Sequence, residues 1–286
     1  MDPRELEYQN VPFNPMEAFV MNLKIGMLCL IISSVLGTAA AGYAAKKETG
    51  FLNRAVTAGK MVYRYQVYVP PDWNASKKWP IILFLHGAGE RGEDGLAQTQ
   101  VGIATAIRLH ADRFPCIVVM PQCRKGVWWP QSEMEAQALA ALKNSTKEFK
   151  GDPDRTYLTG LSMGGYGTWS LAYKYPTMFA ALAPICGGVK PMGKAPVDPG
   201  NPFADPNIDP YAALAKKIGK TPVWIFHGAA DNVVPVIESQ KVNDALNAAG
   251  ANVKYTEYAG VGHNSWDRAY AEAELMPWLL SQRRLR

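Results

Sequence analysis

Apolar residues along this chain gather in short runs that have the length and composition of buried β-strands. Six runs have the pattern that we interpret as parallel strands covered on both faces, most clearly the run at 80–87. They occupy residues 80–87, 116–121, 156–160, 180–185, 222–226 and 253–258. An earlier stretch, residues 61–70, alternates between apolar and polar positions and predicts a half-exposed antiparallel strand.

Longer stretches with helical patterns separate these runs. They cover residues 96–111, 133–149, 165–176, 236–249 and 269–282. Because right-handed crossovers must cover the sheet, this alternation predicts an α/β fold with a mostly parallel, twisted sheet and helices on both faces. The antiparallel strands come first in the chain. Active sites on such sheets lie beyond the carboxyl ends of the strands.

The first 45 residues do not share this alternation. Lys24 leads into an apolar run over residues 25–36, and small residues follow it. These are the three parts of a secretory signal peptide. The run is short for a membrane span, which favours cleavage near Ala41 or Ala44, with an uncleaved anchor as the alternative. A secreted or periplasmic protein is therefore expected.

The domain organisation follows from this division. Residues 1–45 are predicted to be an upstream extension plus a signal peptide, with translation starting at Met21. Residues 46–286 are predicted to form one catalytic α/β domain. A Pro- and Gly-rich stretch at about 187–210 carries little apolar pattern, and we interpret it as an insertion within that domain.

Charge and cysteine content exclude some classes of function. The formal net charge is +5, the basic residues are scattered, and the densest cluster lies at the end of the chain, so nucleic-acid binding is not expected. Of four cysteines, one falls in the predicted signal peptide. Cys116, Cys123 and Cys186 are left either as one disulfide plus a thiol or as three buried thiols, and they show no metal-ligand spacing.

The most specific motif is Gly160-Leu161-Ser162-Met163-Gly164, which directly follows a predicted strand and precedes a predicted helix. This is the sequence form of a nucleophile elbow, in which small residues around the serine relieve the crowding of a sharp turn. Ser162 is the candidate nucleophile. A glycine-rich turn without chemistry is the alternative reading.

A serine nucleophile needs a base, and the chain has four histidines. His86 and His227 each precede a glycine at a strand end, and His110 lies in a predicted helix. His263 lies in a glycine-rich loop after the last strand, from which it can reach a serine on another strand. His263 is therefore the candidate base.

The acid of a triad should lie between the serine and the histidine in chain order. Asp231 meets this condition beyond the strand at 222–226, although it could instead cap the helix that begins near Pro235. Asp209 and Asp267 are weaker alternatives. Two backbone N–H groups are expected to bind the oxyanion, those of Met163 and of Ala88 in the small-residue loop after His86, with Gly87 beside them.

With these residues, the chain resembles the α/β-hydrolase superfamily, and within it the secreted esterases, phospholipase-carboxylesterases and predicted peptidases, a group that includes feruloyl esterase-like and polyhydroxybutyrate depolymerase-like enzymes. The resemblance begins at about residue 51 and runs to the end of the chain. The segments that carry it are residues 85–92, 120–123, 128–129, 160–169 and the loops of Asp231 and His263.

The resemblance implies hydrolysis of carboxylic esters through an acyl-enzyme, without a metal or cofactor. The expected substrates are polysaccharide-linked feruloyl or acetyl esters or similar small molecules, with no nucleic-acid partner and no membrane contact after signal cleavage. Trp128, Trp129 and Trp266 are candidates for lining the cleft, or else for packing. A serine peptidase, a polyester depolymerase and a non-catalytic binding protein of this fold are the alternatives.

Overall fold

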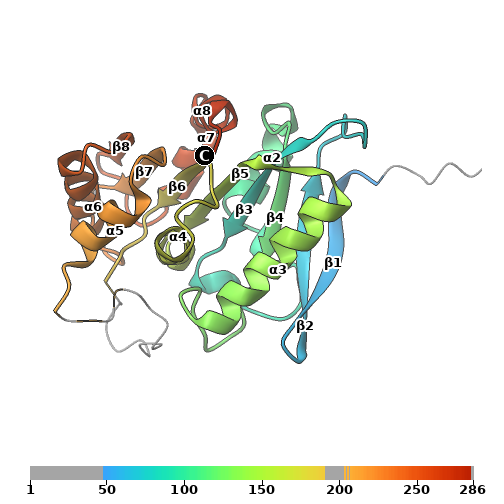
Figure 1. Cartoon of the computed structure of the whole chain (residues 1–286), viewed down its shortest axis with the longest axis horizontal. Helices are drawn as coiled ribbons and strands as arrows, with labels where there is room; N and C mark the ends of the chain where they lie inside the picture. The colour runs from blue at the N-terminus through green and yellow to red at the C-terminus, as the bar shows by residue number, and fades with distance from the viewer. Residues whose placement is uncertain (1–47, 191–202, 204, 206, 285–286) are drawn as a thin grey trace, which may run out of the picture. The chain divides into compact units, whose positions relative to one another are not determined.

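An eight-stranded sheet with the strand order β1-β2-β4-β3-β5-β6-β7-β8 forms the centre of the structure (Figure 1). The computed structural model describes residues 48–190, 203, 205 and 207–284. The strands are β1 (Gly50–Ala58), β2 (Met61–Val69), β3 (Trp79–Leu85), β4 (Ile117–Pro121), β5 (Gly151–Leu161), β6 (Ala181–Ile185), β7 (Val223–Gly228) and β8 (Val253–Tyr258).

Pairing directions follow the sequence pattern. β1, β2 and β4 pair antiparallel in that order, whereas β4, β3, β5, β6, β7 and β8 pair parallel. All seven residues of β3 are buried, which explains its unbroken apolar run. The predicted α/β-hydrolase fold, with a mostly parallel sheet and antiparallel N-terminal strands, is confirmed.

Helices cover both faces of this sheet, and one apolar core lies between the sheet and the helices on each face. One core joins Ile81, Leu83 and Leu85 of β3 to four helices, and the other joins Ile82 and Phe84 to three. The first set is α3 (Ser132–Glu148), α4 (Met163–Lys174), α5 (Pro210–Ile218) and α6 (Ile237–Ala248). The second set is α2 (Ile103–Leu109), α7 (Trp266–Ala271) and α8 (Leu275–Ser281).

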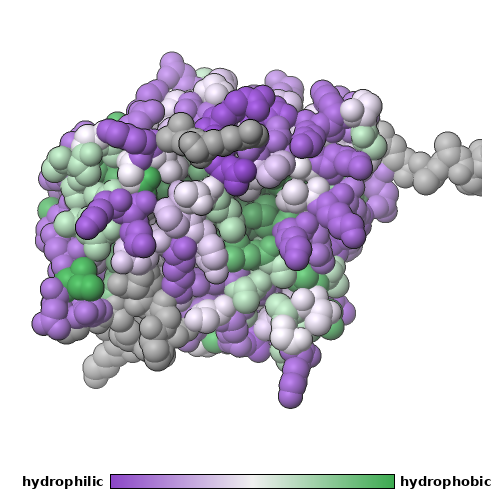
Figure 2. Space-filling model, viewed as in Figure 1, coloured by the Kyte–Doolittle hydropathy of each residue, from purple (hydrophilic) through white to green (hydrophobic). Residues whose placement is uncertain are grey.

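Hydrophilic side chains cover most of the face seen in Figure 2, and the most apolar side chains gather near the centre of the view. None of the helices in the described ranges is both long and apolar enough to cross a membrane. The predicted signal peptide lies outside the described residues. Cys116, Cys123 and Cys186 are all buried and free, so the reading with three buried thiols is the correct one.

Two predicted helices are each divided. The helix expected at 96–111 is replaced by α2 between the short 3₁₀ turns η2 (Ala97–Thr99) and η3 (Ala111–Arg113). Gly102, with φ of 65°, interrupts it where a Cβ would come within 2.6 Å of Leu161 Cδ2. The helix expected at 269–282 becomes α7 and α8, because Glu272 between them adopts φ −55° and ψ 122°.

Two elements were not predicted. One is the edge strand β1, and the other is α5, which follows the Pro-rich stretch. The Asp209 side chain caps α5 by accepting hydrogen bonds from the N–H groups of Tyr211 and Ala212, and Pro210 occupies the first turn. Most of the predicted insertion at 187–210 lies outside the described residues.

Candidate functional site

Three side chains from three different strand ends meet at the carboxyl edge of the sheet. Ser162 follows β5, Asp231 follows β7 and His263 follows β8. Ser162 Oγ lies 2.9 Å from His263 Nε2, and His263 Nδ1 lies 2.7 Å from Asp231 Oδ2. The structure thus brings together the serine, base and acid that sequence reasoning selected.

Ser162 occupies a sharp turn that only small neighbours permit. Its backbone has φ of 52° and ψ of −118°, in the region that L-residues rarely adopt. A Cβ at Gly164 would lie 1.9 Å from Leu85 O, and one at Gly160 would lie 2.3 Å from Gly164 O. These two glycines therefore allow β5 to turn into α4 with the serine at the apex.

Asp231 is held by a turn of its own. Its Oδ1 accepts hydrogen bonds from the N–H groups of Val233 and Val234, at 2.8 and 2.9 Å, which leaves Oδ2 to face His263. The side chain is fully buried. The alternative reading as a helix cap does not hold, because α6 begins only at Ile237.

The two weaker acid candidates are engaged elsewhere. Asp209 caps α5, and Asp267 Oδ2 accepts a hydrogen bond of 2.8 Å from Asn264 Nδ2. Asp231 is the carboxylate that reaches the His263 ring.

Sequence reasoning missed the contact between His227 and this acid. The buried His227 ring places Nε2 3.2 Å from Asp231 Oδ2 and 3.0 Å from Val234 O. A carbonyl only accepts, so Nε2 carries a proton, while Nδ1 lies 2.7 Å from Ser239 Oγ. Burial lowers the pKa of His227, which favours the neutral ring. Its position four residues before Asp231, at the end of β7, is the signal that could have indicated it.

The predicted oxyanion donors flank the serine. Met163 is the first residue of α4, and the turn's first bond runs from Gly165 N–H to Ser162 O at 2.8 Å. The Met163 N–H therefore lies before the first hydrogen bond of the helix and has no acceptor within the helix. Ala88 opens the 3₁₀ turn η1 (Ala88–Glu90), and a Cβ on its neighbour Gly87 would lie 3.6 Å from Ser162 Cβ.

The three tryptophans behave differently from one another. Trp129 is 1% exposed, and its Nε1 donates to His86 O at 2.9 Å, so the expectation that it lines the cleft is wrong. Trp128 is half-buried under the guanidinium of Arg91, 5.7 Å from the ring centre. The Trp266 ring lies edge-on to His263 with 5.4 Å between ring centres. Trp128 and Trp266 stay candidates for substrate contact.

The side chains of Cys186, Asp231 and His263 each place one atom that can bind a metal within 4.8 Å of the other two. Burial raises the pKa of Cys186 to about 12, which disfavours the thiolate that a metal needs. The 2.7 Å hydrogen bond between the other two would also have to open. Asp231 and His263 therefore fit a hydrogen-bonded triad with Ser162 better than a metal centre with Cys186.

Comparison with known proteins places the chain in a family. A model described as the prolyl oligopeptidase family matches residues 129–283, more than half of the sequence. The chain belongs to the prolyl oligopeptidase family. The matched segment of this family member contains the serine, the acid and the histidine of the site.

Individual relatives match different shares of this chain. It is 26% identical to an uncharacterized secreted protein of Arthroderma benhamiae over 71% of this chain but only 24% of that protein. It is 27% identical to the carboxylesterase SOBER1 of Arabidopsis thaliana, over 64% of this chain and 82% of the relative. The solved structure of a thermostable esterase has a TM-score of 0.66 at 33% identity, covering 82% of this chain and 63% of that one.

Proposed function

We propose that this protein hydrolyses carboxylic esters through an acyl-enzyme formed on Ser162. The observation that carries the proposal is the continuous contact from Ser162 Oγ through the His263 ring to Asp231, with both hydrogen-bond distances below 3 Å. Carboxylesterase and esterase relatives support the reaction class. An intact set of serine, base and acid disfavours a non-catalytic binding protein.

In the first half-reaction, Ser162 Oγ attacks the ester carbonyl while His263 Nε2 takes its proton. The carbonyl oxygen becomes an oxyanion that accepts hydrogen bonds from the N–H groups of Met163 and Ala88. The C–O bond to the alcohol then breaks, and His263 returns the proton to the departing alcohol.

In the second half-reaction, water attacks the acyl carbon while His263 takes its proton. The bond between the acyl carbon and Ser162 Oγ then breaks, His263 returns the proton to Oγ, and the acid is released. Asp231 keeps the proton of the neutral His263 ring on Nδ1, so that Nε2 faces the serine, and it stabilises the imidazolium that forms.

The substrate proposal is narrower than the reaction class. Polysaccharide-linked feruloyl or acetyl esters fit an exported enzyme, and the signal-peptide pattern together with a secreted relative supports export. Trp128 beside Arg91 and Trp266 beside His263 offer aromatic surface for a phenolic acyl group or a sugar. A serine peptidase is the second candidate, favoured by the family match.

The test is a panel of short and long p-nitrophenyl esters, methyl ferulate, acetylated xylan and peptide amides. We expect ester turnover in the wild type and a loss of at least about a thousandfold in Ser162→Ala. Ser281→Ala, at an exposed serine of α8, is the matched control and should keep full activity. Cleavage of an amide faster than that of every ester would contradict the proposed esterase function and favour the serine peptidase.

Export has its own test. The N-terminus of the protein recovered outside the cytoplasm should begin after the small residues near position 41 or 44. Recovery of the chain from Met1 in the cell pellet alone would contradict export.

A further inference from the structure

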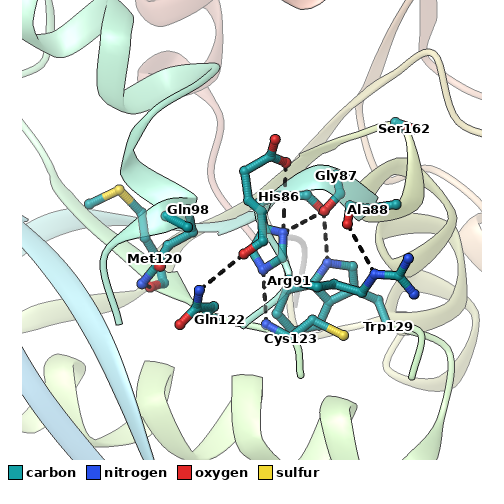
Figure 3. A network of polar contacts seen from close by, with 12 residues as sticks. His86, Gly87, Ala88, Arg91, Gln98, Met120, Gln122, Cys123, Trp129 and Ser162 are labelled. Atoms are coloured by element: carbon teal, nitrogen blue, oxygen red, sulfur yellow. Dashed lines mark hydrogen bonds and ion pairs between the residues drawn. The ribbon is translucent and has the colours of Figure 1, made fainter. Parts of the chain in front are cut away.

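His86 is a fully buried histidine at the end of β3 that the triad does not use. Its ring contacts two backbone groups, Gly87 O at 2.6 Å from Nδ1 and Cys123 N at 2.9 Å from Nε2 (Figure 3). Gly87 and Ala88 lie between this ring and Ser162 in that view. The ring is therefore placed to act on the predicted oxyanion loop.

The two contacts determine where the proton of the ring lies. The N–H of Cys123 can only donate, so Nε2 of His86 must be the unprotonated acceptor. A neutral ring then carries its proton on Nδ1, which donates to Gly87 O. Burial lowers the pKa of His86 to about 4, so the neutral ring persists at neutral pH.

The bond to Gly87 O fixes the direction of the next N–H. In a trans peptide the carbonyl and the N–H of the next residue lie in one plane and point in opposite directions, and the bond between Gly87 and Ala88 is trans. With the Gly87 carbonyl turned toward the His86 ring, the Ala88 N–H projects away from that ring. Ser162 lies close to this peptide, with its Cβ 3.6 Å from the position of a Gly87 Cβ.

Further bonds hold the same peptide in place. Arg91 Nε donates to Ala88 O at 3.0 Å, so the carbonyls on both sides of the Ala88 N–H are occupied. Trp129 Nε1 donates to His86 O at 2.9 Å. The Trp129 side chain also packs over Gly167 of α4, where a Cβ would lie 2.5 Å from Trp129 Cβ. Trp129 thus connects the Ala88 loop with the helix that begins at Met163.

We propose that His86 is a positioning residue for the oxyanion site, which turns the Ala88 N–H toward the reacting carbonyl through its Nδ1–H bond to Gly87 O. This inference rests on the proposed function, because it concerns the same reaction. The role proposed for His86 differs from that of His263, because His86 moves no proton during turnover.

Two conservative variants of His86 each keep one of the two hydrogen-bonding groups of the ring and remove the other. His86→Asn keeps a donor near the position of Nδ1 and loses the acceptor for Cys123 N–H. His86→Gln keeps a group near the position of Nε2 and loses the donor to Gly87 O. We expect kcat to fall at least tenfold in His86→Gln with KM within twofold, and to stay within about threefold in His86→Asn, because loss of a whole oxyanion donor costs about 10²–10³ in kcat.

Rates are expressed per active site, titrated to its end point with a fluorophosphonate, so that misfolded protein is not counted. The inhibition constant of a trifluoromethyl ketone, whose adduct carries an oxyanion, should rise in His86→Gln in parallel with the loss of kcat/KM. His110→Gln, at an exposed histidine, is the matched control and should change neither value. Equal losses in His86→Asn and His86→Gln, or an unchanged kcat per titrated site in His86→Gln, would overturn the proposal.

A measurement on the wild type covers the case in which the variants do not fold. ¹⁵N NMR of the histidine rings should show the His86 proton on Nδ1, and a proton on Nε2 would overturn the proposal. Failure of the proposed function is recognised separately: the fluorophosphonate would not label Ser162, or Ser162→Ala would keep its ester turnover.

Discussion

Acidification should destabilise this fold through His86. The ring is fully buried, and desolvation lowers its pKa from 6.5 to about 4, with the positive charge of Arg91 as a smaller cause. The unfolded chain therefore binds a proton near pH 6.5 that the folded chain does not bind until about pH 4. Stability is lost as pH falls through this window. Because one pKa unit corresponds to about 1.4 kcal/mol, the loss amounts to about 3 kcal/mol.

The assay is urea unfolding at a series of pH values between 7 and 4, on the wild type and on His86→Gln, which has no titrating group at this position. The difference between the two unfolding free energies should change by about 3 kcal/mol across the window, with the wild type losing more. Subtraction is needed because burial raises the pKa of the neighbouring Glu90, which acts in the opposite sense. A difference that stays constant within about 0.5 kcal/mol from pH 7 to 4 would refute the reasoning.

Three further predictions concern the site and its support. His227→Leu leaves Ser239 Oγ and Val234 O buried without their ring partner, so the free energy of unfolding should fall by about 2–4 kcal/mol. The kcat should also drop, because Asp231 loses its contact with the His227 ring. Unchanged values in urea unfolding and ester assays would contradict a role for His227 in holding Asp231. Gly164→Ala should abolish ester turnover and folded yield, because its Cβ would lie 1.9 Å from Leu85 O, and a folded, active variant would show that the elbow can relax. Cys116, Cys123 and Cys186 should react with a thiol reagent only after unfolding, so rapid reaction in the native protein would contradict their burial.

Much of the architecture was predictable because its physical causes are local. Strands such as β3 are buried on both faces, so their apolar runs identify them without knowledge of their neighbours. The elbow is likewise local, since Gly160 and Gly164 are required by contacts within a few residues of Ser162 and with the adjacent strand. The choice of His263 and Asp231 needed only chain order and strand ends.

The parts that were missed depend on contacts between distant segments. A histidine followed by glycine at a strand end looks the same in His86 and His227, yet one contacts Cys123 and the other Ser239 and Asp231. For Trp129 the sequence left lining of the cleft and packing both open, because its packing against Gly167 of α4 is not visible in the sequence. The start of α5 at Asp209 and Pro210 did carry a local signal, which the surrounding Pro-rich stretch obscured.

The most direct test of the central claim is to locate the acyl group during turnover. The wild type is mixed with an excess of a p-nitrophenyl ester, quenched in acid within milliseconds and analysed by peptide mass spectrometry. An acyl adduct on Ser162, absent from Ser162→Ala together with the burst of p-nitrophenol, is the predicted result. Turnover by Ser162→Ala at the wild-type rate, or an adduct on another side chain, would contradict the account.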